Sequence, residues 1–392
     1  MKIFNVVVDK YDYLIEAKNK EEALNEAQRK YAGENANLSL DSDKVAVQAT
    51  TAKKRFDYAL KQLLIKGACF LPGKKLSEDE KENGFGRWLE SKKNGKKRYD
   101  RYLSEKVTML FNTELFDTEI YDAYVNAQGN EFSTGKFYSV ASSSRFVVSS
   151  FSECDEHGKI KPITKIGDKK IECLDFEHPC PVVFKDTKIS EPQLDATFKI
   201  DSDQYFIEAK CHEIFDSHKS LYLKEIYKEP LGELILNNMT NEHIKPCSLE
   251  SGKIDKDTYI GKCEKGKAFE LLTSEDFGVG RNSTHFDFKQ FLCHLMGIIS
   301  FHKTNAEVPI KFYYLFYGYD NNNKTTDKNF DFGKTYCELE KELSAVAEAF
   351  APVFEANNIE FGYLYNDKFD TLTADKWKDK KVLYPLPPKE SK

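Results

Sequence analysis

The sequence lacks several features that would assign it to a broad class at once. None of its apolar runs is long enough to span a bilayer, and its first residues do not have the layout of a secretory signal. It contains no glycine-rich phosphate loop, which argues against an NTPase, and no internal repeat. We therefore expect a cytoplasmic protein with no membrane partner.

Paired cysteines are also missing. The nine cysteines are scattered and never occur as C-x-x-C, so reduced thiols are the expected state. Cysteine and histidine do gather in one segment that is broken by proline and glycine, at Cys154, His157, Cys173, His178 and Cys180. Their spacing matches no zinc finger. Free, buried cysteines are the preferred interpretation, and a zinc site is the alternative.

An excess of basic residues is absent as well. The formal net charge is −6 over 392 residues, which excludes nucleic-acid binding through overall basicity but leaves room for a local basic groove. Hydrophobic residues make up 40% of the chain, with 29 Phe and 21 Tyr, so it can bury a large core. This length suits two domains, or one elaborated domain with a small appendage.

The apolar pattern divides the chain into two parts. Residues 1–50 predict a small ββαβ module, whose helix follows Asn19. Residues 51–392 predict the main α/β domain, which begins with helices near 51–66, 77–91 and 97–111. Residues 131–190 are rich in strand formers, above all 136–151. The later segments predict a helix at 217–239, a helix at 285–303, a strand at 310–319, a helix at 337–357 and a strand at 359–365.

The most informative segment is a pair of strand-like runs at 191–213. With a loop at 201–204, the runs form a hairpin in which Asp195 faces Lys210 and Thr197 faces Glu208. Because side chains alternate along a strand, Asp195, Glu208 and Lys210 then share one face. The other face is expected to be apolar, with Leu194, Ala196, Phe198, Phe206, Ile207 and Ala209.

These three charged side chains indicate metal-assisted chemistry. Two carboxylates on a half-buried face are costly unless they pair or bind a cation. They suit magnesium, which takes few protein carboxylates and keeps several waters. A neighbouring lysine can orient or deprotonate a water that attacks a phosphorus atom. An ordinary ion pair on a solvated sheet face is the alternative.

The run from Asp195 to Glu208-Ala209-Lys210 resembles the D…ExK core of the PD-(D/E)XK nuclease superfamily. Pro192 stands three residues before Asp195, so the literal Pro-Asp pair is absent. The order of segments over about residues 95–320 is also similar to the restriction-endonuclease-like fold of that family. The resemblance implies a mixed central sheet of four strands flanked by helices.

The resemblance also implies roles for individual residues. The carboxylates of Asp195 and Glu208 and the carbonyl of Ala209 would bind magnesium, with manganese as a substitute. Lys210 would position the nucleophilic water.

Further site residues are expected on the helices of such a fold. An acid from the first core helix often joins the site, and Glu105 is the candidate, with Glu191 as a second one. Gln290 is the matching polar position on the second core helix. For Glu105 and Gln290, an exposed helix position is the alternative.

Basic and aromatic residues alternate at 87–106. Phosphate neutralisation needs such a patch, so we expect nucleic-acid contacts from Lys96, Lys97, Arg98 and Arg101. Arg145, in the polar run 141–146, is a further candidate. A solvated helical face is the alternative for the basic cluster.

Together these features predict a magnesium-dependent nuclease that hydrolyses phosphodiester bonds of DNA, with RNA as the less favoured substrate. The resemblance adds an endonuclease role in restriction or in defence against foreign DNA. Two alternatives remain: a non-catalytic nucleic-acid-binding or scaffold protein that retains the fold, and a hydrolase of small phosphoesters. Whether two chains pair as a homodimer is left open.

Overall fold

The computed structural model describes most of the chain. The described ranges are 2–8, 11–34, 45–48, 50–83, 91–93, 96–98, 113–127, 131–215, 222–235, 244–246, 268–271, 285–319 and 332–385. Within these ranges, no helix combines the length and the apolar character that a bilayer crossing requires.

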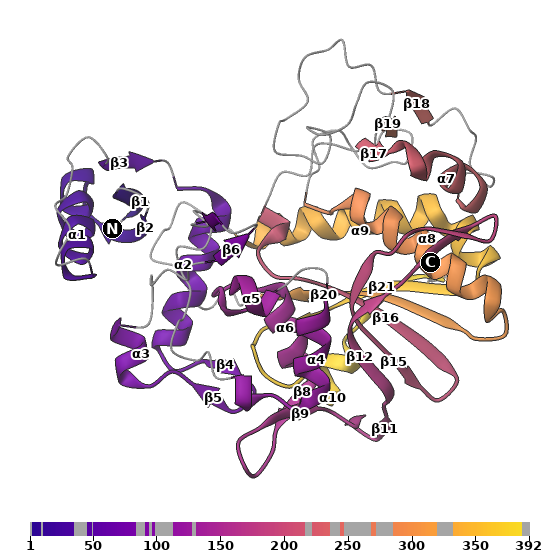
Figure 1. The fold of residues 1–392 in the computed structure, drawn as a ribbon, viewed down its shortest axis with the longest axis horizontal. Helices are drawn as coiled ribbons and strands as arrows, with labels where there is room; N and C mark the ends of the chain where they lie inside the picture. Colours follow the sequence, from indigo (N-terminus) through magenta and orange to yellow (C-terminus); the bar gives the residue numbers. More distant parts are fainter. Residues whose placement is uncertain are drawn as a thin grey trace, which may run out of the picture.

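A six-stranded mixed sheet forms the centre of the fold (Figure 1). Its strands run in the order β12 (Glu172–Pro179), β15 (Gln193–Ile200), β16 (Asp203–Lys210), β20 (Ile310–Tyr317), β21 (Ile359–Asn366) and β22 (Lys381–Tyr384). The first three strands are antiparallel to one another, β16, β20 and β21 are parallel, and β22 closes the far edge in antiparallel orientation. The expected mixed α/β architecture is thus confirmed.

Two long helices connect the parallel strands and cover one face of the sheet (Figure 1). α8 (Phe288–Thr304) leads to β20, and α9 (Phe332–Ala356) leads to β21. Phe291 of α8 stacks on Phe312, and Phe354 of α9 stacks on Phe361. Since Phe312 and Phe361 are paired in the parallel ladder, both helices lie on the same side.

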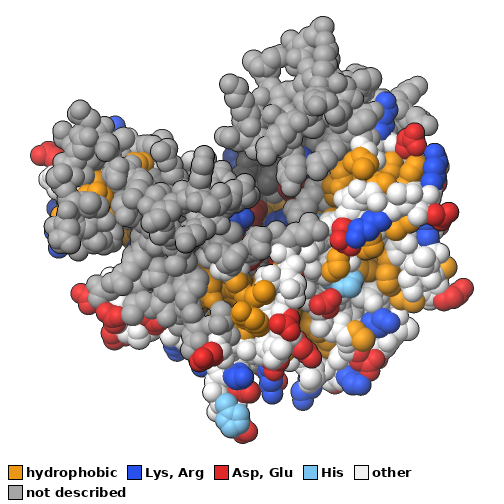
Figure 2. All heavy atoms as spheres, in the orientation of Figure 1, with side chains coloured by type: hydrophobic (Ala, Val, Ile, Leu, Met, Phe, Trp, Pro, Cys, Tyr) orange, Lys and Arg blue, Asp and Glu red, His pale blue; other side chains and the backbone are white. Residues whose placement is uncertain are grey.

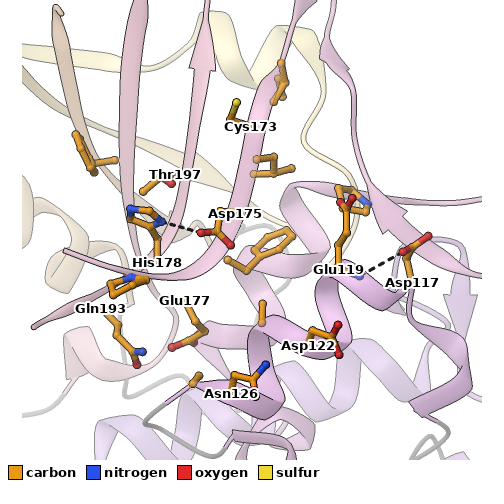
Figure 3. A pocket seen from close by; sticks show the side chains of 18 of the residues that line it. Asp117, Glu119, Asp122, Asn126, Cys173, Asp175, Glu177, His178, Gln193 and Thr197 are labelled. Atoms are coloured by element: carbon orange, nitrogen blue, oxygen red, sulfur yellow. Dashed lines mark hydrogen bonds and ion pairs between the residues drawn. The ribbon is translucent and has the colours of Figure 1, made fainter. Parts of the chain in front are cut away.

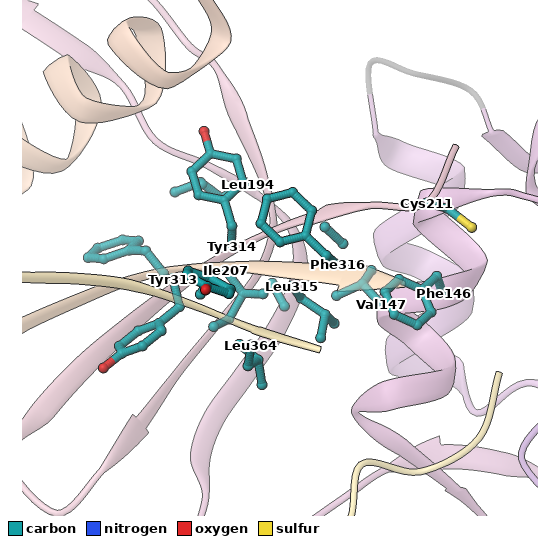
Figure 4. Packing of buried hydrophobic residues seen from close by; sticks show 14 of the residues in the cluster. Phe146, Val147, Leu194, Ile207, Cys211, Tyr313, Tyr314, Leu315, Phe316 and Leu364 are labelled. Carbon is teal, nitrogen blue, oxygen red and sulfur yellow. The ribbon is translucent and has the colours of Figure 1, made fainter. Parts of the chain in front are cut away.

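Shorter helices cover the opposite face. Phe151, which ends α6 (Ser143–Ser150), packs on Phe198, and Trp377 of α10 (Ala374–Lys378) packs on Phe198 and Tyr205. Between the two helical layers, Ile207 and Leu315 are fully buried in the centre of the sheet (Figure 4). Because both faces are covered, the parallel strands are continuously apolar rather than alternating.

The segment 136–151 was expected to be a strand and is helical instead. The Ser142 side chain accepts a hydrogen bond from the backbone N–H of Arg145, which caps the start of α6. Val147 and Val148 favour strands, but each is buried against the core as part of this helix. Tertiary burial and the cap therefore override the local preference of the β-branched residues.

The N-terminal segment forms the expected ββαβ unit. β1 (Lys2–Val8) pairs with β2 (Tyr11–Ala17) and β3 (Val45–Gln48), and α1 (Lys20–Glu34) packs on this sheet. The unit has its own hydrophobic cluster, which includes Val6, Ile15 and Ala27. It touches the rest of the chain through α2 (Ala52–Ile65), where the Tyr58 hydroxyl donates to Glu16.

The three expected early helices are described to different extents. The helix at 51–66 is present as α2. Of the helix expected at 77–91, the structure describes α3 (Glu78–Asn83), and residues 84–90 lie outside the described ranges. β6 (Ser91–Lys93) pairs with β7 (Lys96–Arg98) in antiparallel orientation, so Ser91, Lys97 and Arg98 are in strands rather than in the expected helices. Residues 99–112 lie outside the described ranges.

Later helices and strands agree more closely. α8, β20, α9 and β21 all form where the apolar pattern places them, while the expected helix at 217–239 is a strand followed by short helices. The remaining elements are β4 (Cys69–Leu71), β5 (Lys74–Lys75), η2 (Thr113–Leu115), α4 (Thr118–Asn126), α5 (Glu131–Thr134), η3 (Lys136–Tyr138), β8 (Ser152–Cys154), β9 (Ile160–Pro162), β10 (Lys165–Ile166), β11 (Lys169–Lys170), β13 (Val182–Phe184), β14 (Thr187–Ser190), η4 (Glu213–Phe215), β17 (Tyr222–Lys224), η5 (Glu225–Tyr227), α7 (Lys228–Leu234), β18 (Ile244–Pro246) and β19 (Ala268–Leu271).

Gly297 lets α8 pack closely against the backbone of Cys180, which follows β12. A Cβ at this position would lie 2.5 Å from the carbonyl oxygen of Cys180. The close approach fixes the height of α8 over the sheet, and therefore which of its side chains reach β16.

We predict that Gly297→Ala destabilises the protein by about 1–3 kcal/mol, because the added methyl group forces backbone atoms apart. Chemical denaturation at constant pH measures this change. Ser344→Ala, at an exposed position of α9, is the control and should change stability by less than about 0.5 kcal/mol. Equal stability of the Gly297 variant and the wild type would contradict the close packing.

Candidate active site

The hairpin that carries the candidate residues is tighter than expected. Its turn consists of Asp201 and Ser202 alone, and Asp201 has a φ of 55°, which a short polar residue tolerates. The register of the hairpin runs from Ile200 opposite Asp203 to Ala196 opposite Ile207. Continued by one pair, it puts Asp195 across from Glu208 rather than from Lys210.

The observed register differs from the expected one by two residues. The charged side chains therefore stay on the face of the sheet where they were expected. Asp195, Glu208 and Lys210 still share one side of the sheet, because a shift of two preserves the alternation. Phe206, which was expected on the other face, lies on the Glu208 side and packs on Phe301 of α8. α8 therefore covers the face that carries the acids.

Glu208 is buried beneath α8 and paired with Lys210. Its side chain is 2% exposed, and its Oε1 accepts a hydrogen bond from Lys210 Nζ at 2.5 Å. The alternative of an ion pair on a solvated sheet face is therefore wrong. Burial raises the pKa of Glu208, although Lys210 partly offsets this.

Asp195 organises the backbone next to Glu208. Its Oδ2 accepts the N–H of Ala209 at 2.6 Å, and the side chain is half-buried. Burial and then the negative charge of Glu208 hold the pKa of Asp195 well above its usual range. The two carboxyls thus crowd each other on neighbouring strands.

Lys210 keeps its charge in this setting. Burial alone would lower the pKa of Lys210, but Glu208, Asp195 and Glu213 together outweigh it and raise the pKa. Glu213 in turn accepts the backbone N–H of Cys211. One ammonium group therefore faces three carboxyls.

The end of β16 is tied to α2 by another charged pair. His212 Nδ1 lies 2.6 Å from Asp57 Oδ1. Burial works against the charged imidazole, yet Asp57 raises the pKa of His212 above its ordinary value. Cys211, between Lys210 and His212, is buried, so a Cys–His nucleophile is not formed here.

Glu177 is an acid of this site that sequence reasoning missed. It lies on β12 between the pairs Phe176–Ala196 and His178–Leu194, and hence across from Asp195. Burial, followed by the charges of Asp195, Glu131 and Glu208, raises the pKa of Glu177 to about 9. Its φ of 51° is a local backbone distortion that no sequence pattern signals.

A pocket of about 1130 Å³ opens beside Glu177 (Figure 3). It lies between β12, the first part of β15, the loop before β12 and α4, and Phe206 of β16 and Phe301 of α8 also line it. Asp175, Glu177 and His178 of β12 line it together with Asp122 of α4, and His178 pairs with Asp175. Gln193 and Thr197 of β15 line it too, so the pocket continues the sheet face that carries Asp195.

Magnesium fits the donors at this place. Glu208 Oε2 is buried and has no hydrogen-bond partner among the described residues. The charge of Glu208 raises the pKa of Asp195, and a bound cation would offset this repulsion. Within the described part of the chain, no three His, Cys, Asp or Glu side chains stand together as a chelating group. Magnesium needs only one or two carboxylates and completes its shell with water, so two donors suffice.

The other predicted site residues have mixed outcomes. Gln290 lies on α8, one turn before His294, on the side that faces β16, and its side chain is half-buried. Glu105 and Arg101 lie outside the described residues. Lys96, Lys97 and Arg98 form β7, and only their backbone is described. Figure 2 shows acidic and basic side chains interspersed over the described surface of one face.

The prediction that Arg145 contacts nucleic acid is wrong. Its side chain is fully buried, with the guanidinium between the rings of Phe70 and Phe369. It donates hydrogen bonds to the carbonyls of Ser139 and Val140. Arg145 therefore holds the turn before α6 and has no access to a phosphate.

The cysteines and histidines at 154–180 do not gather around one point. Cys154 packs near Gly73, Cys180 is buried against Gly297, and His178 pairs with Asp175. The described cysteines are all free thiols.

Compared with models of protein families, with curated proteins and with solved structures, the chain has no significant match. The site must therefore be interpreted from its own geometry.

The raised pKa of Glu177 leads to a prediction about stability and pH. A carboxyl with a raised folded-state pKa stabilises the fold fully below its ordinary value of 4.5 and loses this contribution as the pH rises towards 9. Glu177→Gln does not titrate, so it should melt about 2–4 °C above the wild type at pH 8 and with little difference at pH 4.

Thermal unfolding across this pH range measures the effect. Glu172→Gln, at an exposed position of the same strand, is the control and should show no such gain, since Lys170 lowers the pKa of Glu172. Parallel pH profiles of wild type and Glu177→Gln would show that Glu177 titrates normally.

Proposed function

We propose that this protein is a magnesium-dependent nuclease with a restriction-endonuclease-like fold that cuts DNA. The observation that carries the proposal is the buried ion pair of Glu208 and Lys210, with Asp195 across the hairpin. Hydrolysis of a phosphodiester by water is the reaction that uses two carboxylates, a cation and an ammonium group together.

The topology supports the same proposal. The chain runs through the helix α6, the strand β12, the hairpin β15–β16, the crossover helix α8 and the parallel strand β20. This is the order of segments that the resemblance implies. The acids lie on a hairpin inside a mixed sheet, and α8 covers them, which is consistent with that order.

The chain's own residues divide the work as follows. Asp195, Glu208 and the Ala209 carbonyl would hold the cation, which when bound polarises the phosphoryl oxygen and lowers the pKa of water. Because the pKa of Lys210 is raised, this residue orients the water and stabilises negative charge rather than accepting the proton. Asp195 also fixes the Ala209 peptide through its hydrogen bond.

Contact with DNA is assigned to the β6–β7 hairpin, and the cellular role follows from the resemblance. The lysine-rich hairpin β6–β7 would contact phosphates, which an acidic protein needs for nucleic-acid binding. The proposed role is that of a cytoplasmic endonuclease that cleaves foreign DNA in restriction or defence. Manganese would substitute for magnesium, and a homodimer would let two sites cut both strands.

The first test is cleavage of plasmid and linear DNA in magnesium, manganese and EDTA. Lys210→Ala should lower metal-dependent cleavage by at least about 10²-fold, because the oriented ammonium group is lost. Lys199→Ala, at an exposed position of the same hairpin, is the matched control and should cut normally. Intact DNA with the wild type in every metal would contradict a nuclease.

Glu208→Gln separates the nuclease from a non-catalytic nucleic-acid-binding protein. The neutral isostere should abolish cleavage, because a metal ligand is lost, while DNA binding in a gel-shift assay stays the same or becomes tighter. If the wild type binds DNA without cutting it, and the variant binds equally well, the binding protein is the better account.

A further inference from the structure

His294 is an unused polar group at the centre of the candidate site. It sits in the middle of α8 with 3% of its side chain exposed, and its Nδ1 lies 3.4 Å from Glu208 Oε2. Neither of these two atoms has a hydrogen-bond partner among the described residues. The hydroxyl of Tyr314, which pairs with Glu208 across β16 and β20, is also buried without one.

The tautomer of His294 follows from the hydrogen bond that its other ring nitrogen makes. His294 donates a hydrogen bond to the backbone carbonyl of Gln193, and since Nδ1 has no partner, the donor is Nε2. In a neutral imidazole whose proton is on Nε2, the other ring nitrogen, Nδ1, is a hydrogen-bond acceptor. Nδ1 therefore presents a lone pair to Glu208.

Two acceptor atoms facing each other in a buried place require a positive centre near both. A carboxylate oxygen and an imidazole lone pair repel each other at this distance unless a proton or a metal ion lies between them. Lys210 donates to Oε1, the other oxygen of Glu208, and leaves Oε2 and Nδ1 without a donor among the described residues. Ring nitrogens that bind metals typically donate their other N–H to a backbone carbonyl, as His294 does to Gln193.

We propose that His294 Nδ1 is a ligand that shares a divalent cation with Glu208, and that it makes the site prefer manganese over magnesium. The inference rests on the cation site of the proposed function but not on DNA cleavage. Imidazole nitrogen is a ligand for transition metals, whereas magnesium is held by oxygen ligands, so a nitrogen ligand favours manganese, a transition metal, over magnesium. The sequence places His294 within an otherwise apolar helix, where it resembles a core residue.

The test uses the full chain, freed of metal and titrated with manganese or magnesium by calorimetry. His294→Gln replaces the nitrogen ligand by a hard oxygen. It should weaken manganese binding at least about tenfold, while magnesium binding changes less than about threefold. His302→Gln, two turns further along α8, is the matched control and should change neither affinity.

Pulsed electron paramagnetic resonance gives a second readout that does not depend on activity. Manganese bound to the wild type should show a directly coordinated nitrogen-14 signal, and this signal should be absent in His294→Gln. A folded His294→Gln with an unchanged ratio of manganese to magnesium affinity, or wild-type manganese without a nitrogen signal, would overturn the inference.

The outcomes separate this inference from the proposed function. Nitrogen-coordinated manganese in a wild type that leaves DNA intact would support His294 as a ligand and contradict the nuclease. Metal-dependent cutting with oxygen-only coordination would support the nuclease and contradict the role of His294. If the wild type binds neither metal, a proton between Glu208 and His294 explains their contact, and both proposals fail.

Discussion

The buried ion pair between Lys210 and Glu208 is the interaction on which the candidate site depends. A carboxylate that is 2% exposed needs a partner, and Lys210 supplies it at 2.5 Å. The same ammonium group also faces Asp195 and Glu213. When all three carboxyls are ionised, one ammonium group does not balance their charge, and the proposed cation would do so. Such an imbalance is costly for the fold and is expected where binding or catalysis requires it.

The sheet and its helices hold these groups in place from several directions. The short turn at Asp201-Ser202 sets the register of the hairpin, and the Asp195 carboxylate holds the Ala209 peptide. The close contact at Gly297 brings α8 down onto the acids. The pair of His212 with Asp57 attaches the end of β16 to α2. Apart from the Asp195 contact, these contacts do not involve the proposed metal ligands, yet they fix the geometry of the site.

Much of the central fold could be predicted from the sequence, because α8, β20, α9 and β21 are long segments with strong apolar patterns. The faces of Asp195, Glu208 and Lys210 were also predictable. They depend only on alternation along a strand, which the two-residue error in register leaves unchanged.

The remaining features depend on tertiary contacts. The segment at 143–150 has the composition of a strand, but its cap and its burial make it a helix. Arg145 appears in a polar run and yet lies between two aromatic rings of the core. Glu177 itself has a positive φ, and His294 lies in a largely apolar helix. Local pattern carries no information about any of these placements.

The central claim is that the acids around Lys210 form a cation site. Crystals soaked in manganese and measured at the manganese absorption edge test this claim most directly. The account predicts one strong anomalous peak in contact with the carboxylates of both Asp195 and Glu208, which excess magnesium weakens. A map with no anomalous peak between these two residues, from crystals in which the soak reaches other surface carboxylates, would contradict the account.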